Sequence, residues 1–257
     1  MTKDSALGGY ALYHKVTSAL SPTIERDGLI FDASTKTPAS RAARLREKEP
    51  DTINWLEDNL RPDDVFYDIG ANVGVYSLFA AMRCAHVIAF EPESLNYACL
   101  NKNIFLNGLD EKITALNIAL YDEDLVSKLN ISNFREGKSG HNFHHEVDHE
   151  LAPSTPVFKQ SVVGLRLDSF VQKFGLETPS VIKIDVDGQE RGILLGLGQI
   201  LADAKLRTIA VETNSRVREH LEIRGELEKF GFELSEDPQY INLEYREGGV
   251  ENMFYFR

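Results

Sequence analysis

Short apolar runs alternate with segments of helical periodicity along most of this chain. The runs read as buried strands, because they are rich in β-branched residues and end near glycines or acids: Val65–Ile69, His86–Phe90, Ile113–Leu120, Val181–Asp185 and Leu206–Val211. The segments between them repeat their apolar residues at a helical spacing: 75–83, 94–106 and 190–201. This alternation predicts one α/β domain, residues 61–257, with helices on both faces of a mostly parallel sheet.

Three parts of the chain depart from the alternation. Residues 1–60 are predicted to form a helical extension, with helices at 10–20 and 51–60, that acts as a lid or a partner surface. Residues 125–165 are predicted to be an insertion above the C-terminal ends of the strands, where it could shape substrate choice. The last segments alternate apolar and polar residues, which predicts antiparallel strands at the end of the sheet: 232–234, 240–245 and 253–256.

The stretch from Val65 to Ser77 reads as strand, turn and helix, and it carries the clearest signal for a ligand site. Gly70 and Gly74 allow backbone angles or close approaches that a Cβ atom would forbid. Asn72 stands where a dinucleotide-binding turn would have its second glycine. The spacing of this turn therefore opposes a bound pyrophosphate.

Two acids at strand ends narrow the ligand further. Asp68, two residues before Gly70, would repel a pyrophosphate but would favour an ammonium or a sulfonium group. Glu91 follows the second strand, where a carboxylate can accept hydrogen bonds from both hydroxyls of a ribose. NAD enzymes bind the ribose in the same way. Glu91 therefore indicates a cofactor that contains adenosine, but it does not distinguish a dinucleotide from a cofactor with an ammonium or sulfonium group. Strand-end solvation or helix capping is the alternative for both acids.

The strand Val181–Asp185 is the most polar of the predicted core strands. A period of two places Lys183 and Asp185 on the same face, with Asp185 at the C-terminal end, where open α/β sheets bind ligands. A buried lysine needs a partner, so a structural ion pair of Lys183 with Asp185 or Glu190 is the alternative to a reactive site. Glu212, at the end of the next strand, also has two interpretations: a residue of the site or a solvated acid at a strand end.

A histidine-rich tract occupies the middle of the insertion. Its histidines are accompanied by acids: His141, His144, His145 and His149, with Glu146, Asp148 and Glu150. Such side chains can ligate zinc or manganese, but the tract lacks a recognised ligand spacing, and no metal site is assigned. Whether the tract binds a metal, faces the substrate or forms a solvated loop stays open.

Composition limits the partners. The formal net charge is −12, and a nucleic-acid footprint needs a clustered basic surface, so anionic polymers are not expected as substrates. No apolar stretch is long enough for a membrane span, and the N-terminus lacks a signal-peptide pattern, so a cytoplasmic protein is expected. Cys84 and Cys99 are predicted to be reduced thiols in the core. Whether the protein forms a homo-oligomer stays open. The basic residues of the extension are expected on a solvated helix face: Arg41, Arg44, Arg46 and Lys48.

Taken together, these residues resemble the FkbM family of S-adenosylmethionine (SAM) dependent methyltransferases. The resemblance runs from about Asp63 to the C-terminus and rests on an ordered set of motifs: FYDIGANVGVYS at 66–77, AFEP at 89–92, the segment 101–108, LRLDS at 165–169 and IKIDVDGQE at 182–190. The family usually has a glutamate where Asp187 stands. Residues 1–60 and 135–160 lie outside the resemblance, so information on the substrate is expected there.

The resemblance implies a class I methyltransferase fold, a Rossmann-like three-layer sandwich around a mostly parallel seven-stranded sheet whose last strand is antiparallel. It implies SAM as the cofactor, with these residues in its site and the last two at the edge of the adenine: Asp68, Gly70, Asn72, Gly74, Glu91, Ala119 and Asp122. The implied activity is methyl transfer to a small-molecule acceptor, usually a hydroxyl of a sugar, polyketide or related metabolite. Because a neutral alcohol must lose its proton, Asp185 is predicted to be the base or the substrate orienter, with Lys183 and Glu190 setting its charge state and position.

Two other classes of function stay open. An NAD-dependent, sugar-modifying oxidoreductase would keep the strand, the turn and Glu91, but the glycine spacing and the missing Tyr-x-x-x-Lys type of catalytic pair oppose it. A noncatalytic SAM-binding module would keep the turn but would need no functional group at the end of the fourth strand, where Asp185 stands.

Overall fold

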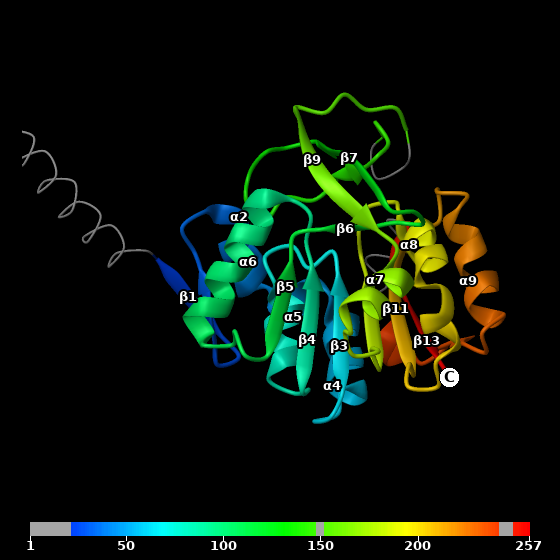
Figure 1. Cartoon of the computed structure of the whole chain (residues 1–257). Coiled ribbons are helices and arrows are strands. Elements are labelled where there is room, and N and C mark those ends of the chain that lie inside the picture. The colour runs from blue at the N-terminus through cyan, green and yellow to red at the C-terminus, as the bar shows by residue number, and fades with distance from the viewer. Residues whose placement is uncertain (1–21, 148–151, 242–248) are drawn as a thin grey trace, which may run out of the picture.

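A seven-stranded sheet forms the centre of the molecule (Figure 1). The computed structural model describes residues 22–147, 152–241 and 249–257. Across the sheet the strands follow in the order β12 (Glu233–Leu234), β13 (Val250–Phe256), β11 (Thr208–Asn214), β10 (Val181–Ile184), β3 (Val65–Ile69), β4 (His86–Phe90) and β5 (Ile113–Leu116). The strands from β11 to β5 are parallel, and β13 runs antiparallel between β11 and β12. This is the sheet that the resemblance implied, with its last strand antiparallel.

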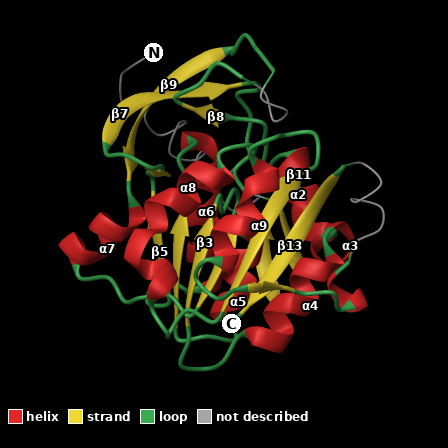
Figure 2. Cartoon of the chain, turned by 90° about the vertical axis from the view of Figure 1, so that its right-hand side faces the viewer, coloured by secondary structure: helices red, strands yellow, loops and turns green. Residues whose placement is uncertain are grey.

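Helices cover both faces of this sheet and give the molecule three layers (Figure 2). One face is covered by α4 (Pro50–Asn59), α5 (Val75–Ala81) and α6 (Ser94–Asn107), and the other by α7 (Leu167–Phe174), α8 (Glu190–Leu197) and α9 (His220–Glu228). Alternate residues of one strand serve the two cores, since Phe66 belongs to the first and Tyr67 to the second. Strands buried on both faces are continuously apolar, which is why their runs could be read from the sequence.

A second sheet of four strands lies above the C-terminal ends of the parallel strands (Figure 1). Its order is β6 (Ala119–Leu120), β9 (Phe158–Leu165), β7 (Leu125–Ile131) and β8 (Asn142–Phe143), so the predicted insertion supplies most of it. The prediction of a single strand at Ile113–Leu120 is wrong. Strand β5 of the large sheet ends at Leu116, and Ala119 pairs with Gly164 of the small sheet. An apolar run reads the same in either sheet, so its pattern cannot show where the chain passes between them.

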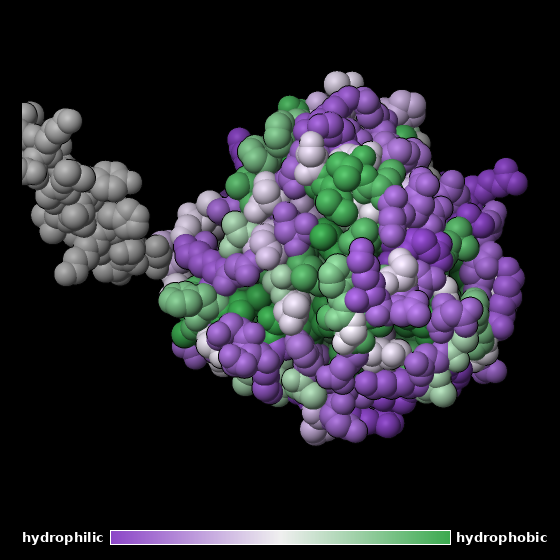
Figure 3. All heavy atoms as spheres, in the orientation of Figure 1, coloured by the Kyte–Doolittle hydropathy of each residue, from purple (hydrophilic) through white to green (hydrophobic). Residues whose placement is uncertain are grey.

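The outer face of the small sheet carries exposed apolar side chains. Val126 and Val163 are cross-strand partners and are 75% and 44% exposed, whereas Leu129 and Val162 are buried beneath them. Figure 3 shows apolar side chains gathered over β7 and β9 on a face that is otherwise largely hydrophilic. The buried face of the small sheet is therefore the one that turns toward the edge of the large sheet.

The sequence predicts a helical N-terminal extension, but its described part also contains a pair of strands. A hairpin of β1 (Thr23–Arg26) and β2 (Leu29–Asp32) precedes α2 (Lys36–Ala43), α3 (Leu45–Lys48) and α4. The turn Asp27-Gly28, in which both residues have positive φ, is the sequence signal for this hairpin. The hairpin is held to α6, because the Asn107 side chain hydrogen-bonds both backbone groups of Ile30. The helix predicted at 10–20 lies outside the described residues.

The strand predicted at 240–245 is not found in its described part, because Tyr240 ends a short 3-10 helix, Pro238–Tyr240, and residues 242–248 lie outside the described part of the chain. Other predicted elements differ from the structure in their limits. The strand predicted to end at Val211 continues to Asn214, and the next helix begins at His220. Cys84 and Cys99 are buried free thiols, as predicted. None of the helices in the described part of the chain combines the length and hydrophobicity of a membrane span.

Candidate active site

A cleft of three adjoining hollows lies between the C-terminal edge of the large sheet and the small sheet. The central hollow is lined mainly by polar residues: Gly70, Asn72, Glu91, Asp185, Asp187 and Glu212. The apolar hollow is lined by hydrophobic side chains, among them Phe90, Pro92, Ile118, Ala119, Phe143 and Ile193. The outer hollow is lined by charged groups, among them Arg41, Lys48, Asp187, Glu190, Glu212 and His220. His141 borders the first two hollows and Glu212 borders the central and outer ones, so the three form one continuous site.

The turn after β3 is shaped by close packing against the end of β10. Gly70 has a φ of 82°, and a Cβ atom on it would lie 1.8 Å from the carbonyl oxygen of Asp185. Gly74 has a φ of 84°, and its Cβ would lie 2.3 Å from a methyl group of Leu100. The sequence-based expectation for both glycines is confirmed, since both take positive φ and both are approached closely.

Glu91 is fixed at the end of β4 by backbone donors. Its two carboxylate oxygens accept hydrogen bonds from the backbone N–H groups of Asn72, at 2.7 Å, and Glu93, at 2.8 Å. Burial raises the pKa of Glu91 to about 8, although these two donors favour the ionised form. Asn72 itself takes a φ of 52°, which aims its backbone N–H at Glu91. The carboxylate thus stands at the wall of the central hollow, close to the apolar one.

Asp68 lies beneath the cleft rather than in its wall. Its side chain is fully buried, and the hydroxyl of Ser77 donates to it at 2.5 Å. Its other oxygen has no hydrogen-bond partner in the described part of the chain. Lys183 is its cross-strand partner, and burial raises the pKa of Asp68 despite this positive charge. A direct contact of Asp68 with the cofactor stays a prediction.

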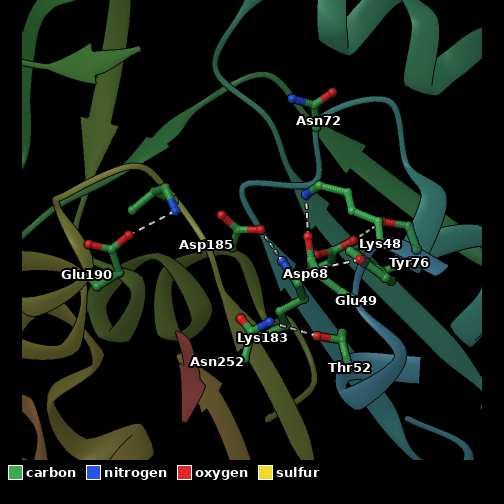
Figure 4. A network of polar contacts seen from close by, with 12 residues as sticks. Lys48, Glu49, Thr52, Asp68, Asn72, Tyr76, Lys183, Asp185, Glu190 and Asn252 are labelled. Carbon is green, nitrogen blue, oxygen red and sulfur yellow. Dashed lines mark hydrogen bonds and ion pairs between the residues drawn. The ribbon is translucent and has the colours of Figure 1, made fainter. Parts of the chain in front are cut away.

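Lys183 and Asp185 form the ion pair that the sequence left open, with 2.8 Å between the ammonium and a carboxylate oxygen (Figure 4). The Lys183 side chain is 3% exposed and its ammonium lies 5.0 Å from the centre of the Tyr76 ring. Burial opposes the ionisation of Asp185, but the attraction of Lys183 outweighs it and lowers the pKa of Asp185 to about 2. Burial likewise opposes the charge on Lys183, and the attraction of Asp185 and Asp68 outweighs it and raises the pKa of Lys183 to about 12. Both groups are therefore charged at neutral pH.

Glu190 acts on the turn after β10 and does not contact Lys183, so the pair proposed between them does not form. Its carboxylate accepts from the backbone N–H groups of Gly188, at 3.0 Å, and Val186, at 3.2 Å. The Nε2 atom of His220 lies 2.9 Å from the Oε2 atom of Glu190, which also accepts from Gly188. Figure 4 shows Glu190 pointing to this turn and away from Lys183. Glu190 thus positions the backbone next to Asp185 without setting its charge.

The two residues predicted at the adenine edge are separated by the structure. Ala119 lines the apolar hollow. Asp122 is not among the residues that line the three hollows, and its carbonyl accepts a hydrogen bond from Arg166 at 2.7 Å. The chain turns away from the cleft between them, because it leaves β6 for the edge of α8.

The described histidines of the insertion have separate environments. His141 lines the cleft, and burial lowers its pKa to about 4. His144 and His145 instead contact the hydroxyls of Ser127 and Tyr121. Among the described residues no group of three His, Cys, Asp or Glu side chains is arranged as a metal site. His149 lies outside those residues, together with Asp148 and Glu150.

Sequence reasoning missed the basic side chains of the cleft. Arg41 and Lys48 were expected on a solvated helix face, but both line the central and outer hollows. Arg41 also donates to the carbonyl of Gly137 at 2.8 Å, and Lys48 pairs with Glu49. The helices α2 and α3 that carry them are too short for their periodicity to reveal a buried face, so no local signal could have found them.

Comparison with known proteins shows the family of the chain. Residues 68–234, well over half of the chain, match the family described as the methyltransferase FkbM domain. The chain belongs to this family. FkbM methyltransferases use SAM as their cofactor.

Three curated proteins that are similar in sequence to this chain differ from it in length. It is 30% identical over 185 residues to the AMB antimetabolite synthetase AmbE of Pseudomonas aeruginosa, covering 61% of this chain and 9% of that protein. It is 28% identical over 215 residues to the 31-O-demethyl-FK506 methyltransferase FkbM of Streptomyces tacrolimicus, covering 73% and 80%. It is 26% identical over 153 residues to the hexuronic acid methyltransferase AglP of Haloferax volcanii, covering 60% and 58%. The chain thus spans a small part of the first protein and little more than half of the third.

A solved FkbM structure shares the fold. The methyltransferase FkbM from Methylobacillus flagellatus superposes with a TM-score of 0.50 at 13% sequence identity, covering 77% of this chain and 44% of the other. The large, mostly parallel sheet with helices on both faces is accordingly a class I methyltransferase fold.

The chain's own residues fit the cofactor of the FkbM family. Absence of a side chain at Gly70 lets the turn after β3 lie against β10, and a carboxylate at Glu91 can accept from two ribose hydroxyls. Next to Glu91, the apolar hollow provides the kind of surface on which a planar, uncharged base such as adenine packs. The ionised Asp185 at the opposite wall suits the positive charge of a sulfonium.

Proposed function

We propose that this chain is a SAM-dependent O-methyltransferase that acts on a hydroxyl of a small-molecule acceptor, a sugar, a polyketide or a related metabolite. The observation that carries the proposal is the order of groups along the cleft, in which Glu91 stands between an apolar hollow and a row of carboxylates. The relatives named for 31-O-demethyl-FK506 and for hexuronic acid support an oxygen acceptor on a small molecule.

Different parts of the cleft would bind the cofactor and orient the acceptor. SAM supplies an electrophilic methyl group on a sulfonium, and placement in line with the nucleophile contributes much of the rate. Glu91 would hold the ribose, with Asn72 and Gly70 at the methionine end and Ala119 beside the adenine. Asp185, held ionised by Lys183, would orient the acceptor at the centre of the cleft.

Basic residues of the N-terminal extension would contribute to the acceptor site. Arg41 of α2 and Lys48 of α3 reach the outer hollow, which lies away from Glu91 and opens next to Asp187 and Glu212. We assign the outer hollow to the acceptor, so the described part of the extension forms a wall of the acceptor site.

Calorimetry with purified protein tests the cofactor. Titration with SAM is expected to give saturable heat, and titration with NAD is expected to give none. Absence of heat with SAM together with clear binding of NAD would overturn the proposal in favour of an oxidoreductase. Incubation with methyl-labelled SAM and a host metabolite extract then separates an enzyme from a noncatalytic SAM-binding module, because only the enzyme produces a labelled small molecule.

We expect the affinity for SAM to rise with pH. In the free protein burial raises the pKa of Glu91 to about 8, so most of its carboxyl groups are protonated at neutral pH. Below this pKa most Glu91 side chains are protonated, whereas the ribose hydroxyls donate to the ionised form. Binding should therefore release a proton and strengthen by up to about tenfold per pH unit until the pH exceeds the pKa.

Calorimetry between about pH 6 and about pH 9, in buffers of different ionisation enthalpy, measures both effects. Glu91→Gln is the matched control, because it keeps the size of the side chain and removes its titration. That variant should bind SAM more weakly and with little pH dependence. Equal pH profiles for the two proteins would show that Glu91 does not bind the ribose in its ionised form.

A further inference from the structure

We propose that Glu212 accepts the proton of the acceptor hydroxyl, while Asp185 stays ionised throughout the reaction. The inference rests on the proposed function, since it assigns a role within methyl transfer to an alcohol. It assigns the proton to a different residue from the one that the sequence suggested.

Glu212 lies between the central hollow and the outer hollow of the cleft. Val211 of β11 is the parallel partner of Ile184 of β10, so the next residues, Glu212 and Asp185, lie side by side at the edge of the sheet. Parallel partners point to the same face of a sheet, and Glu212 therefore projects beside the Lys183–Asp185 pair. Glu212 lines both the central and the outer hollow.

The oxygens of Glu212 are available to a ligand. Three neighbouring acids are each engaged by the protein: Asp185 by Lys183, Asp187 by the backbone N–H of Gly140 at 2.6 Å, and Glu190 by the turn after β10. Glu212 makes no hydrogen bond or ion pair with any residue that the structure describes, and its side chain is only half-buried. Its lone pairs can thus accept the hydroxyl proton without first breaking a contact.

Burial and the surrounding charges give Glu212 a higher proton affinity than Asp185. Burial, then Asp185, Asp187, Glu49 and Glu190, raise the pKa of Glu212 well above its ordinary value. Asp185 is shifted in the opposite direction by Lys183. The charged and titratable groups around this part of the cleft come from several elements: Arg41, Lys48, Glu49, Lys183, Glu190 and His220. A base gains efficiency as its pKa approaches the working pH, so Glu212 is better suited to the task than Asp185.

Methyl transfer needs only one group besides SAM and the acceptor, the Glu212 carboxylate that takes the proton. The hydroxyl oxygen forms a bond to the methyl carbon, and the bond between carbon and sulfur breaks and leaves its electron pair on the sulfur. The hydroxyl proton passes to the Glu212 carboxylate and from there to water through the open hollow. Asp185 keeps its negative charge and Lys183 its positive charge before and after transfer.

Substitution of Glu212 tests this role against methyl-labelled SAM and a host metabolite extract. Glu212→Gln is expected to lower the rate of labelled product formation by about 10² to 10⁴-fold. It should leave the SAM dissociation constant, measured by calorimetry, within about threefold, because Glu91 and the turn after β3 are unchanged. The matched control is Glu219→Gln, an exposed acid beyond the same strand, which should leave both quantities unchanged.

The pH profile separates a base from a structural group. At saturating SAM, which removes the pH dependence of SAM binding through Glu91, the rate of the native protein should rise with pH as Glu212 ionises. This rise should be lost in Glu212→Gln but retained in Asp187→Asn. Loss of the rise in Asp187→Asn alone would overturn the proposal and assign the proton to Asp187. Full activity of Glu212→Gln would overturn it as well. If the native protein labels no product although it binds SAM, the proposed function fails, and the role of Glu212 fails with it.

Discussion

Replacement of Asp185 by asparagine is expected to abolish turnover while SAM still binds within a few fold of the native affinity. Asp185 lies at the centre of the cleft with its charge fixed by a lysine at 2.8 Å, so asparagine keeps the shape and removes the charge that orients the acceptor. Glu91 and the apolar hollow, which would hold the adenosine, are left intact. Single-turnover assays with labelled SAM and calorimetry measure the two quantities on the same protein.

The substitution also leaves Lys183 as a buried charge without its nearest partner. Removing one member of a buried pair costs about 3 to 5 kcal/mol of unfolding free energy, and the neighbouring Asp68 should keep the loss toward the lower end. The double variant Lys183→Met/Asp185→Asn removes both charges and should recover much of this stability, measured by urea unfolding. Turnover should stay absent in it. If the double variant is both stable and active, Asp185 has no role in the reaction.

Gly70→Ala is expected to lower the free energy of unfolding by about 4 kcal/mol or more. The added Cβ would lie 1.8 Å from the carbonyl oxygen of Asp185, a backbone atom that cannot move aside without displacing the end of β10. The positive φ of 82° adds the strain that a side chain experiences in the left-handed region. We also expect SAM binding to weaken, since the displaced turn carries the backbone N–H that orients Glu91.

Gly108→Ala is the matched control for this collision. Gly108 caps α6 at a φ of 61°, and nothing lies within 4 Å of the position that its Cβ would take. Its substitution should cost only the conformational strain, about 1 to 2 kcal/mol. Urea unfolding of both variants with equal m-values gives the difference directly. Similar losses for the two would mean that the close approach at Gly70 contributes nothing beyond its φ.

Features that depend on neighbours in the chain could be predicted from the sequence. The strands β3, β4 and β10 were found because a strand buried on both faces is continuously apolar, whatever lies beside it. The glycines of the turn after β3 were assigned correctly because positive φ and lack of space both exclude a Cβ atom. Glu91 could be placed at the cleft because an acid that ends a parallel strand must lie at the C-terminal edge of the sheet.

Tertiary structure decided which of these groups meet and what charge they carry. Lys48 and Arg41 reach the cleft from the N-terminal extension, which no pattern in their short helices shows. The choice of Asp185 over Glu190 as the partner of Lys183 was made by the turn after β10, whose backbone N–H groups engage Glu190. The high proton affinity of Glu212 comes from its burial and from acids on other elements that packing brings near it. Sequence thus determined the elements, the turn after β3 and the position of Glu91 through local rules. Distances between remote side chains, and the pKa values that follow from them, exist only in the packed chain.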